Sequence, residues 1–204
     1  PLRGAVTWKS IVGTNVAPDA LSNLASAGVM GGALIVVGED YGEGASVIQE
    51  RSHAFALKSS VWLVDPRPNL PTIVDLVEKS FQLSEATNTP VMMELRIRAC
   101  HVTGEFAAKD NVAPAYSRKH LLAGPAAQNY DKLSHPPATF RQEKHKHEVR
   151  LPAAREFIVE RGLNEIFDSA EKSVGVIVQG GLYNAALRAM SELGLADAFG
   201  APRL

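Results

Sequence analysis

Short apolar runs recur along the first half of the chain and define its predicted organisation. They lie at residues 4–9, 33–38, 61–65 and 90–97, and each is followed by glycine or by polar residues. The runs are nearly continuous in hydrophobicity and do not alternate between apolar and polar positions, a pattern typical of strands buried on both faces. We therefore predict four buried parallel strands.

Amphipathic stretches separate these runs and predict helices. Apolar positions at residues 18–27 share one helical face, and those at residues 45–58 do the same. A third stretch repeats apolar residues at helical spacing from Leu70 to Phe81, with Asn69 placed to cap it and Pro71 in its first turn. Strands that alternate with helices imply right-handed crossovers, so the predicted fold class is α/β, a mainly parallel sheet with flanking helices.

The alternation stops between residues 104 and 150. This stretch holds prolines at positions 114, 125, 136 and 137 and four of the six histidines. Unstructured loops of that length are uncommon inside one compact domain, so we interpret residues 104–150 as a connector after a first domain at 1–103. A helical stretch at 151–161, a strand at 174–178, a glycine turn and a further helix then predict that residues 151–204 begin a second α/β domain.

Polar residues after the first predicted strand form one candidate site. Open parallel sheets bind ligands outside the carboxyl ends of their strands. Thr14 and Asn15 stand there beside a predicted helix N-terminus, which suits an anionic group. A simpler interpretation is that Asn15 or Asp19 only caps the helix.

The acidic, glycine-rich stretch after the second predicted strand is the other candidate. Glu39, Asp40 and Tyr41 lie among glycines that would let a ligand or a partner approach the backbone closely. The alternative is a solvated turn in which Ser46 lies near a helix N-cap. Sequence pattern alone does not separate the two interpretations.

Composition excludes several classes of protein. The formal net charge of -1 gives no indication of a nucleic-acid partner. A single cysteine can form no intramolecular disulfide and cannot hold an iron–sulfur cluster, which needs about four ligands. There is no apolar run of about 18 residues and no recognisable signal peptide, so we expect a cytoplasmic protein without a membrane segment. The phosphate loop of nucleoside triphosphatases is also absent from the sequence.

Three further motifs have unremarkable interpretations. QGGLYN at residues 179–184 resembles a shortened dinucleotide turn, but it lacks the third glycine, and packing of a helix on a strand explains it as well. His145 and His147 alternate with lysines that would repel a metal ion, so a solvated connector is favoured. We interpret Cys100 as a small buried residue at a strand end and not as a nucleophile.

A longer, ordered resemblance adds to this picture. The stretch from VTWKSIVGTNVAPD through VVGEDYGEGASVIQERSHAFA to VMMELRIRACH resembles the pyrimidine-binding (PYR) domain of indolepyruvate ferredoxin oxidoreductase, in its alpha subunit or its fused bacterial form. NEIF and VGVIVQGGLYN resemble the next domain of the same family. The resemblance implies an incomplete thiamine-diphosphate-binding fold of PYR type, and we expect the chain to be a fragment.

The resemblance also implies an activity and its cofactors. The family carries out coenzyme-A-linked oxidative decarboxylation of aryl 2-oxo acids, with thiamine diphosphate and Mg²⁺ as cofactor and ferredoxin as electron acceptor. It implies an oligomeric enzyme with a partner domain or subunit that binds thiamine diphosphate. The motif for the metal and the diphosphate and the iron–sulfur clusters are expected outside this chain.

For individual residues the resemblance implies little chemistry. The family's glutamate that assists the pyrimidine ring belongs to a segment upstream of Pro1, so no catalytic residue and no metal ligand is assigned here. Thr14, Asn15, Glu39, Asp40 and Tyr41 are expected to line the edge that faces the cofactor or a neighbouring domain. The chain alone is expected to be inactive. The alternatives are a non-catalytic α/β binding or scaffold module and a nucleotide-binding regulator.

Overall fold

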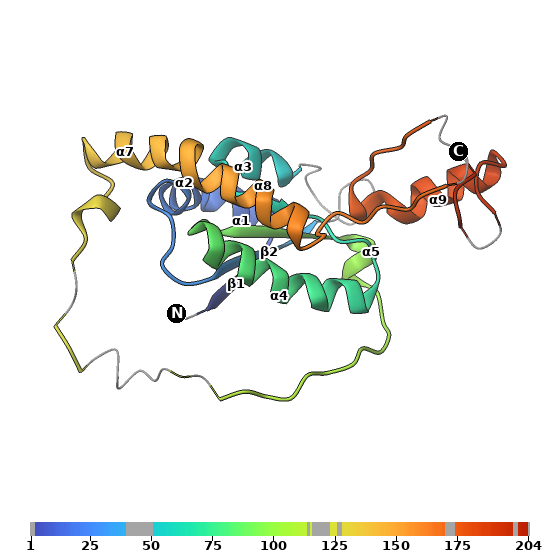
Figure 1. The fold of residues 1–204 in the computed structure, drawn as a ribbon, viewed down its shortest axis with the longest axis horizontal. Coiled ribbons are helices and arrows are strands. Elements are labelled where there is room, and N and C mark those ends of the chain that lie inside the picture. The colour runs from blue at the N-terminus through green and yellow to red at the C-terminus, as the bar shows by residue number, and fades with distance from the viewer. Residues whose placement is uncertain are drawn as a thin grey trace.

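The computed structural model describes residues 3–39, 51–113, 115, 123–125, 128–169, 174–197 and 200–203. Its centre is a sheet of four parallel strands in the order β1-β2-β4-β3 (Figure 1). The strands are β1 (Gly4–Lys9), β2 (Ala33–Glu39), β3 (Trp62–Val64) and β4 (Val91–Arg96). All four predicted strands and the α/β fold class are therefore confirmed.

Burial differs between the centre and the edge of the sheet. Val91, Met92 and Met93 of β4 are fully buried, as the continuous apolar run predicts. The edge strand β1 is mostly exposed, and 46% of the surface of Val6 is accessible to solvent. The prediction that all four strands are buried is thus wrong for β1, because only β2 pairs with it and little covers it on the described part of the chain.

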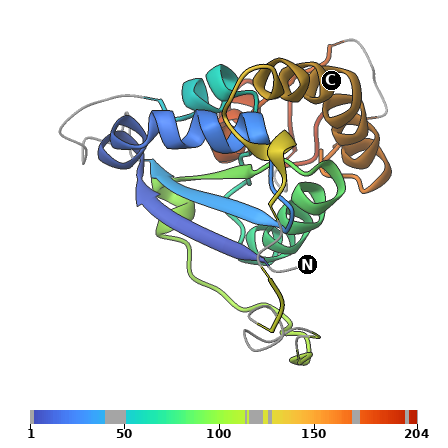
Figure 2. The same cartoon turned by 90° about the vertical axis from the view of Figure 1, so that its left-hand side faces the viewer.

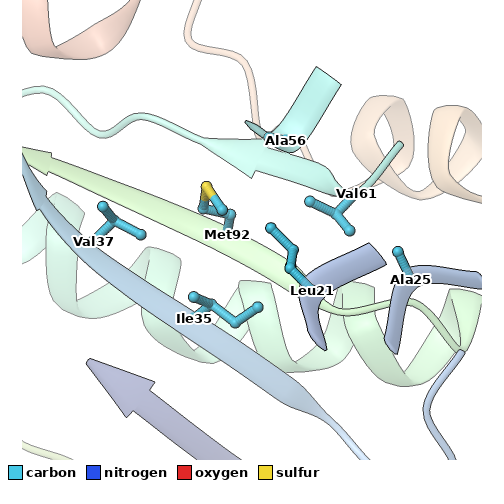
Figure 3. Close-up of a cluster of buried hydrophobic side chains, with 7 residues drawn as sticks. All are labelled: Leu21, Ala25, Ile35, Val37, Ala56, Val61 and Met92. Carbon is cyan, nitrogen blue, oxygen red and sulfur yellow. The ribbon is translucent and has the colours of Figure 1, made fainter. Parts of the chain in front are cut away.

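Helices cover both faces of the sheet (Figures 1 and 2). On one face lie α1 (Ser10–Val16), α2 (Pro18–Ala27) and α3 (His53–Ser59). Figure 3 shows Leu21 and Ala25 of α2 beside Ile35 and Met92 of the sheet. On the other face, α4 (Leu70–Thr87) and α8 (Leu151–Glu160) pack on β2 and β4 through a second core cluster. Two buried layers therefore hold the sheet rigid.

The long helix α4 begins as its sequence predicts. The side chain of Asn69 accepts a hydrogen bond from the backbone N–H of Thr72 at 3.1 Å, and Pro71 lies in the first turn. The helix continues to Thr87, one and a half turns beyond Phe81. The predicted helix at 18–27 is also confirmed, since α2 has those bounds.

The remaining elements follow β4. The short helix α5 (Ile97–Cys100) ends the strand, and a 3₁₀ turn (Tyr130–Lys132), α7 (Ala138–His145) and a π-helical turn (Lys146–Arg150) lead into α8. A 3₁₀ turn (Gly180–Leu182) then precedes α9 (Tyr183–Glu192), which confirms the last predicted helix. Helix α8, from the predicted second domain, packs in one core with α4 from the first. The division into 1–103, 104–150 and 151–204 stays a prediction.

The segment after β1 is helical, although the sequence predicted no helix before residue 18. Residues Ser10–Val16 form helix α1 despite a glycine at its centre. A Cβ atom on Gly13 would lie 2.3 Å from Cδ1 of Trp8, so the glycine lets the helix backbone pack directly on the indole. Tertiary packing here outweighs the low helix propensity of glycine.

The second predicted helix, at 45–58, starts later than expected within the described residues. Arg51 precedes it, Ser52 is the N-cap and α3 begins at His53. The backbone N–H of Ser52 donates to Oε1 of Glu39 at 2.7 Å instead of to a helical carbonyl. The predicted residues 45–50 lie outside the described residues.

The predicted strand at 174–178 is not a strand in the structure. Residues 174–179 carry no ladder with any described strand, and the side chain of Ile177 is fully exposed. Apolar sequence predicted a buried strand, but none of the described segments lies beside it to form the ladder. Gln179, at the end of this segment, contacts Arg96 of β4, and Figure 1 shows α9 extending beyond the end of the sheet.

Candidate carboxylate site at the end of the sheet

The carboxyl ends of β2, β3 and β4 bring four charged residues together. Pairing sets Glu39 beside Arg96 and Val37 beside Glu94. Because side chains alternate along a strand, Glu39, Glu94 and Arg96 share the face that carries Ile35, Val37 and Met92. Asp65 directly follows β3 and contacts Arg96. We call Glu39, Asp65, Glu94 and Arg96 the carboxylate cluster.

Arg96 is the charged centre of this cluster. Its Nη2 lies 2.9 Å from Oδ2 of Asp65, and its Nε donates to the same oxygen at 3.0 Å. Its Nη2 also donates to the side-chain oxygen of Gln179, and the N–H of Gly181 donates to Oδ1 of Asp65 at 2.9 Å. A segment over 80 residues away in sequence therefore closes one side of the cluster.

Glu94 and Glu39 are both buried, with different partners. Glu39 is 2% exposed and accepts from the backbone of Ser52. Glu94 is 0% exposed, and neither of its carboxylate oxygens has a hydrogen-bond partner among the described residues. Nε of Arg96 lies 3.9 Å from its Oε1, close enough for an ion pair but too long for a hydrogen bond. A buried carboxylate in this state costs folding free energy and is an acceptor for a donor from elsewhere.

Burial shifts the ionisation of the cluster. Removal from water raises the pKa of the Asp65 carboxyl to about 6, the N–H of Gly181 opposes this rise, and the charge of Glu39 adds to it. Burial also lowers the pKa of the Arg96 guanidinium, while Glu39 raises it. The cluster is thus a desolvated group of carboxylates around a guanidinium.

The structure places the predicted site residues in different environments. Glu39 belongs to the cluster, whereas Thr14 lies in α1, where it is 1% exposed and its hydroxyl has no hydrogen-bond partner among the described residues. Asn15 is exposed, and Asp40 and Tyr41 lie outside the described residues. Helix α2 has no side-chain cap, since Ala17 is its N-cap, so neither Asn15 nor Asp19 has the capping role that was the alternative.

Asp65, Glu94 and Arg96 were not predicted as site residues. A sequence signal existed for Glu94, because an acid in the middle of the buried run VMMELR requires compensation or a ligand. Asp65 and Arg96 end their strands, but their pairing depends on the order of β3 and β4 in the sheet. That order cannot be read from a single sequence.

The other candidate motifs form no catalytic or metal site among the described residues. Cys100 is exposed, so its predicted burial is wrong: α5 turns it outward, and its thiol donates to the carbonyl of Leu95. His147 lies 3.1 Å from a carboxylate oxygen of Glu143, one helical turn away. The described residues contain no group of three or more potential metal ligands. None of the helices in this described part is both long and apolar enough to cross a membrane.

An open cavity of about 980 Å³ lies between α4 and the C-terminal segments. Asp65, Arg67, Phe167, Ile177 and Tyr183 are among the residues that line it. Glu39 and Glu94 do not line this cavity, so the buried part of the carboxylate cluster lies behind it. Asp65 is the residue that the cavity and the cluster share.

Comparison with known proteins confirms the resemblance found in the sequence. The indolepyruvate oxidoreductase subunit IorA of Methanothermobacter marburgensis is 25% identical over 190 residues, and that of Pyrococcus abyssi is 26% identical over 192. The matches cover 93% and 94% of this chain but only 30% and 29% of those relatives, so the chain spans less than a third of their length. No family model matches, and no solved structure matches.

Proposed function

We propose that this chain forms part of an oxidoreductase for aryl 2-oxo acids such as indolepyruvate. The observation that carries the proposal is the similarity of 93% of the chain to a protein named indolepyruvate oxidoreductase subunit IorA. The match covers 30% of that relative, which supports the proposal that the chain supplies one part of such an enzyme and is inactive alone.

Thiamine diphosphate with Mg²⁺ is the cofactor that we propose for the complete enzyme. When bound, it supplies the carbanion-stabilising centre that decarboxylation of a 2-oxo acid requires. The carboxylate cluster fits one end of this molecule. The aminopyrimidine ring carries N–H donors, and Glu94 offers a buried carboxylate that lacks a hydrogen-bond partner among the described residues.

The other end of the cofactor does not fit the cluster. A diphosphate is an anion, and Glu39, Asp65 and Glu94 together outweigh the charge of Arg96. We therefore propose that the cluster serves the pyrimidine end and that the diphosphate and Mg²⁺ lie against a partner domain or subunit. Thr14, Asn15, Asp40 and Tyr41 remain the proposed edge toward that partner.

In this proposal the chain holds and orients the cofactor and performs no proton transfer. Glu94 would accept an N–H from the ring, and Glu39 and Ser52 fix the neighbouring backbone through their 2.7 Å hydrogen bond. The apolar side chains of Val37 and Met92 exclude water, which strengthens a hydrogen bond to a carboxylate. No catalytic acid or base is assigned to any residue.

The other partners belong to the same proposal. Coenzyme A accepts the acyl group and ferredoxin the electrons, through iron–sulfur clusters outside this chain. The single cysteine supports that placement, because a cluster needs about four ligands. A cytoplasmic, oligomeric enzyme is part of the proposal, and the low cysteine usage is compatible with that compartment.

Hydrogen exchange of the 204-residue chain tests the pyrimidine assignment. We expect thiamine, which has the aminopyrimidine but no diphosphate, to slow exchange at residues 91–96 and at the amide of Ser52, whereas inorganic pyrophosphate leaves both unchanged. Glu94→Gln removes a charge-assisted hydrogen bond and should weaken thiamine binding at least about tenfold. Glu156→Gln, on the exposed side of α8, is the matched control and should bind normally.

Each other outcome argues against part of the proposal. Protection by pyrophosphate would place the diphosphate at the cluster, contrary to the charge argument. A chain that binds neither compound would favour the non-catalytic α/β module. Thiamine-dependent decarboxylation of indolepyruvate by the chain alone would contradict its expected inactivity.

A further inference from the structure

Two carboxylates lie within reach of one guanidinium at the end of β4. Arg96 donates to Asp65 at 3.0 Å, while Oε1 of Glu94 lies 3.9 Å from the same Nε. Glu94 and Arg96 stand two residues apart on one strand and therefore project from the same face. A rotation of the Arg96 side chain would exchange one partner for the other.

A turn at residues 179–181 favours the Asp65 arrangement. Gln179 accepts from Nη2 of Arg96, and the N–H of Gly181 donates to the Asp65 oxygen that Nε does not use. Both partners of the ion pair are thus held by this turn. Glu94, by contrast, receives no hydrogen bond from it.

The turn fits against the sheet only because residues 180 and 181 are glycines. A Cβ atom on Gly180 would lie 2.1 Å from the carbonyl oxygen of Asp65. A Cβ atom on Gly181 would lie 2.2 Å from Cδ of Arg96. These distances are far below contact distance. A side chain at position 180 would meet backbone and push the turn away, and one at position 181 would force apart the turn and the side chains of the ion pair. Close approach to Asp65 and Arg96, and not to a nucleotide, accounts for the two glycines of the QGG motif.

We propose that docking of this turn determines which carboxylate Arg96 neutralises. With the turn docked, Arg96 is bound by Asp65 and Gln179, and the buried carboxyl of Glu94 keeps only the 3.9 Å contact with Nε of Arg96, with no hydrogen bond among the described residues. With the turn displaced, Arg96 turns to Glu94. A buried carboxylate without a close partner is energetically costly. Displacement of the turn therefore stabilises Glu94 by giving it Arg96 as a partner, and docking of the turn removes that stabilisation.

The consequence links the C-terminal segment to the carboxylate site. Arg96 and Gln179 are positioning residues for Glu94. Gln179 holds Arg96 on Asp65 when the turn is docked, which keeps the Glu94 carboxylate free for a donor, and Arg96 occupies that carboxylate when the turn is displaced. The role of this switch in catalysis rests on the proposed function, because the donor that would bind Glu94 is the proposed aminopyrimidine. The switch between partners itself needs no ligand.

A double-mutant cycle on the 204-residue chain, without thiamine, tests the switch. In the native background, Glu94→Gln replaces a buried carboxyl that accepts no hydrogen bond among the described residues, and it should raise the urea midpoint or leave it unchanged. In a Gly181→Ala background, it removes the new partner of Arg96 and should lower the midpoint. This reversal of sign is not expected if Gly181 and Glu94 have independent structural roles. A Glu94→Gln effect of the same sign in both backgrounds would overturn the proposal.

Hydrogen exchange reports docking directly. We expect Gly181→Ala to speed exchange of the residue 181 amide at least tenfold relative to Gly175→Ala, whose added Cβ meets no atom within 4 Å. Unchanged protection at residue 181 would also overturn the proposal. If Gly181→Ala does not fold, Gln179→Ala removes one partner of Arg96 without a steric clash, and the same cycle with Glu94→Gln decides. Failure of thiamine to bind affects the proposed function and leaves this result intact.

Discussion

At the scale of single residues, opposing interactions act on the ionisation of the Asp65 carboxyl group. Its ion pair with Arg96 and the hydrogen bond from Gly181 favour the ionised form, and burial favours the neutral form. Burial is the largest contribution, and the pKa of Asp65 is raised to about 6. The folded chain therefore binds this proton more tightly than the unfolded chain, in which an aspartate has a pKa of about 3.9.

This shift predicts a pH dependence of stability. Because the folded-state pKa is the higher one, the cost of the buried carboxylate is present above about pH 6 and is relieved as the pH falls toward about 4. Over that window the native chain should gain free energy of unfolding relative to Asp65→Asn, on the order of 2 kcal/mol. Urea denaturation of both chains at several pH values measures the difference. A difference that does not change with pH would mean that Arg96 keeps Asp65 ionised throughout.

Single residues also show the limit of what sequence can predict about the site. Glu39 was found because it directly follows an apolar run, and it lies in the carboxylate cluster. Glu94 could have been found from its position inside a buried strand. The role of Arg96 could not, because its contacts with Asp65 and Gln179 span 31 and 83 positions and depend on the folded arrangement.

At the scale of elements, continuous apolar runs of four to eight residues predicted the four paired strands correctly, although β1 at the edge is mostly exposed. The same criterion predicted a strand at 174–178, where no described neighbour provides a ladder. Helix α1 was missed for the opposite reason. Its central glycine argues against a helix in isolation, and only contact with Trp8 explains it.

The junction of α7 and α8 offers an element-scale prediction. Arg150 is 4% exposed and donates to the carbonyls of Ala25 and Ser26 at the end of α2, at 3.1 and 2.8 Å. It also donates to the carbonyl of Gln142 in α7. Arg150→Ala should lower the free energy of unfolding by about 3 kcal/mol, because buried carbonyls lose charged donors and a cavity remains.

Arg155, about one and a half helical turns after Arg150, provides the control for this prediction. Arg155→Ala removes the same side chain from an exposed position on α8 and should change stability by less than about 0.5 kcal/mol. Urea denaturation of the three chains gives both numbers. Equal effects of the two substitutions would show that Arg150 does not tie α2 to the junction.

At the scale of the whole molecule, the sheet and its two helical layers form a well-packed body, while the C-terminal part exposes apolar surface. Val174, Val176 and Ile177 are 59%, 55% and 102% exposed, and Ile166 nearby in the same cavity lining is 88% exposed. Helix α9 has no buried residue. Single exposed apolar side chains are ordinary, but a contiguous group of them favours association.

We therefore expect the 204-residue chain to self-associate through this apolar group. Its sedimentation coefficient should rise with concentration between about 1 and 100 μM, the range in which moderate apolar contacts become populated. Val176→Ser together with Ile177→Ser should suppress that rise. Leu57→Ser, which removes a 76% exposed apolar residue on α3, should not, because Leu57 lies outside the group. If the double substitution leaves the association unchanged, the contact lies elsewhere, and the apolar character of residues 174–178 does not govern how the chain meets its neighbours.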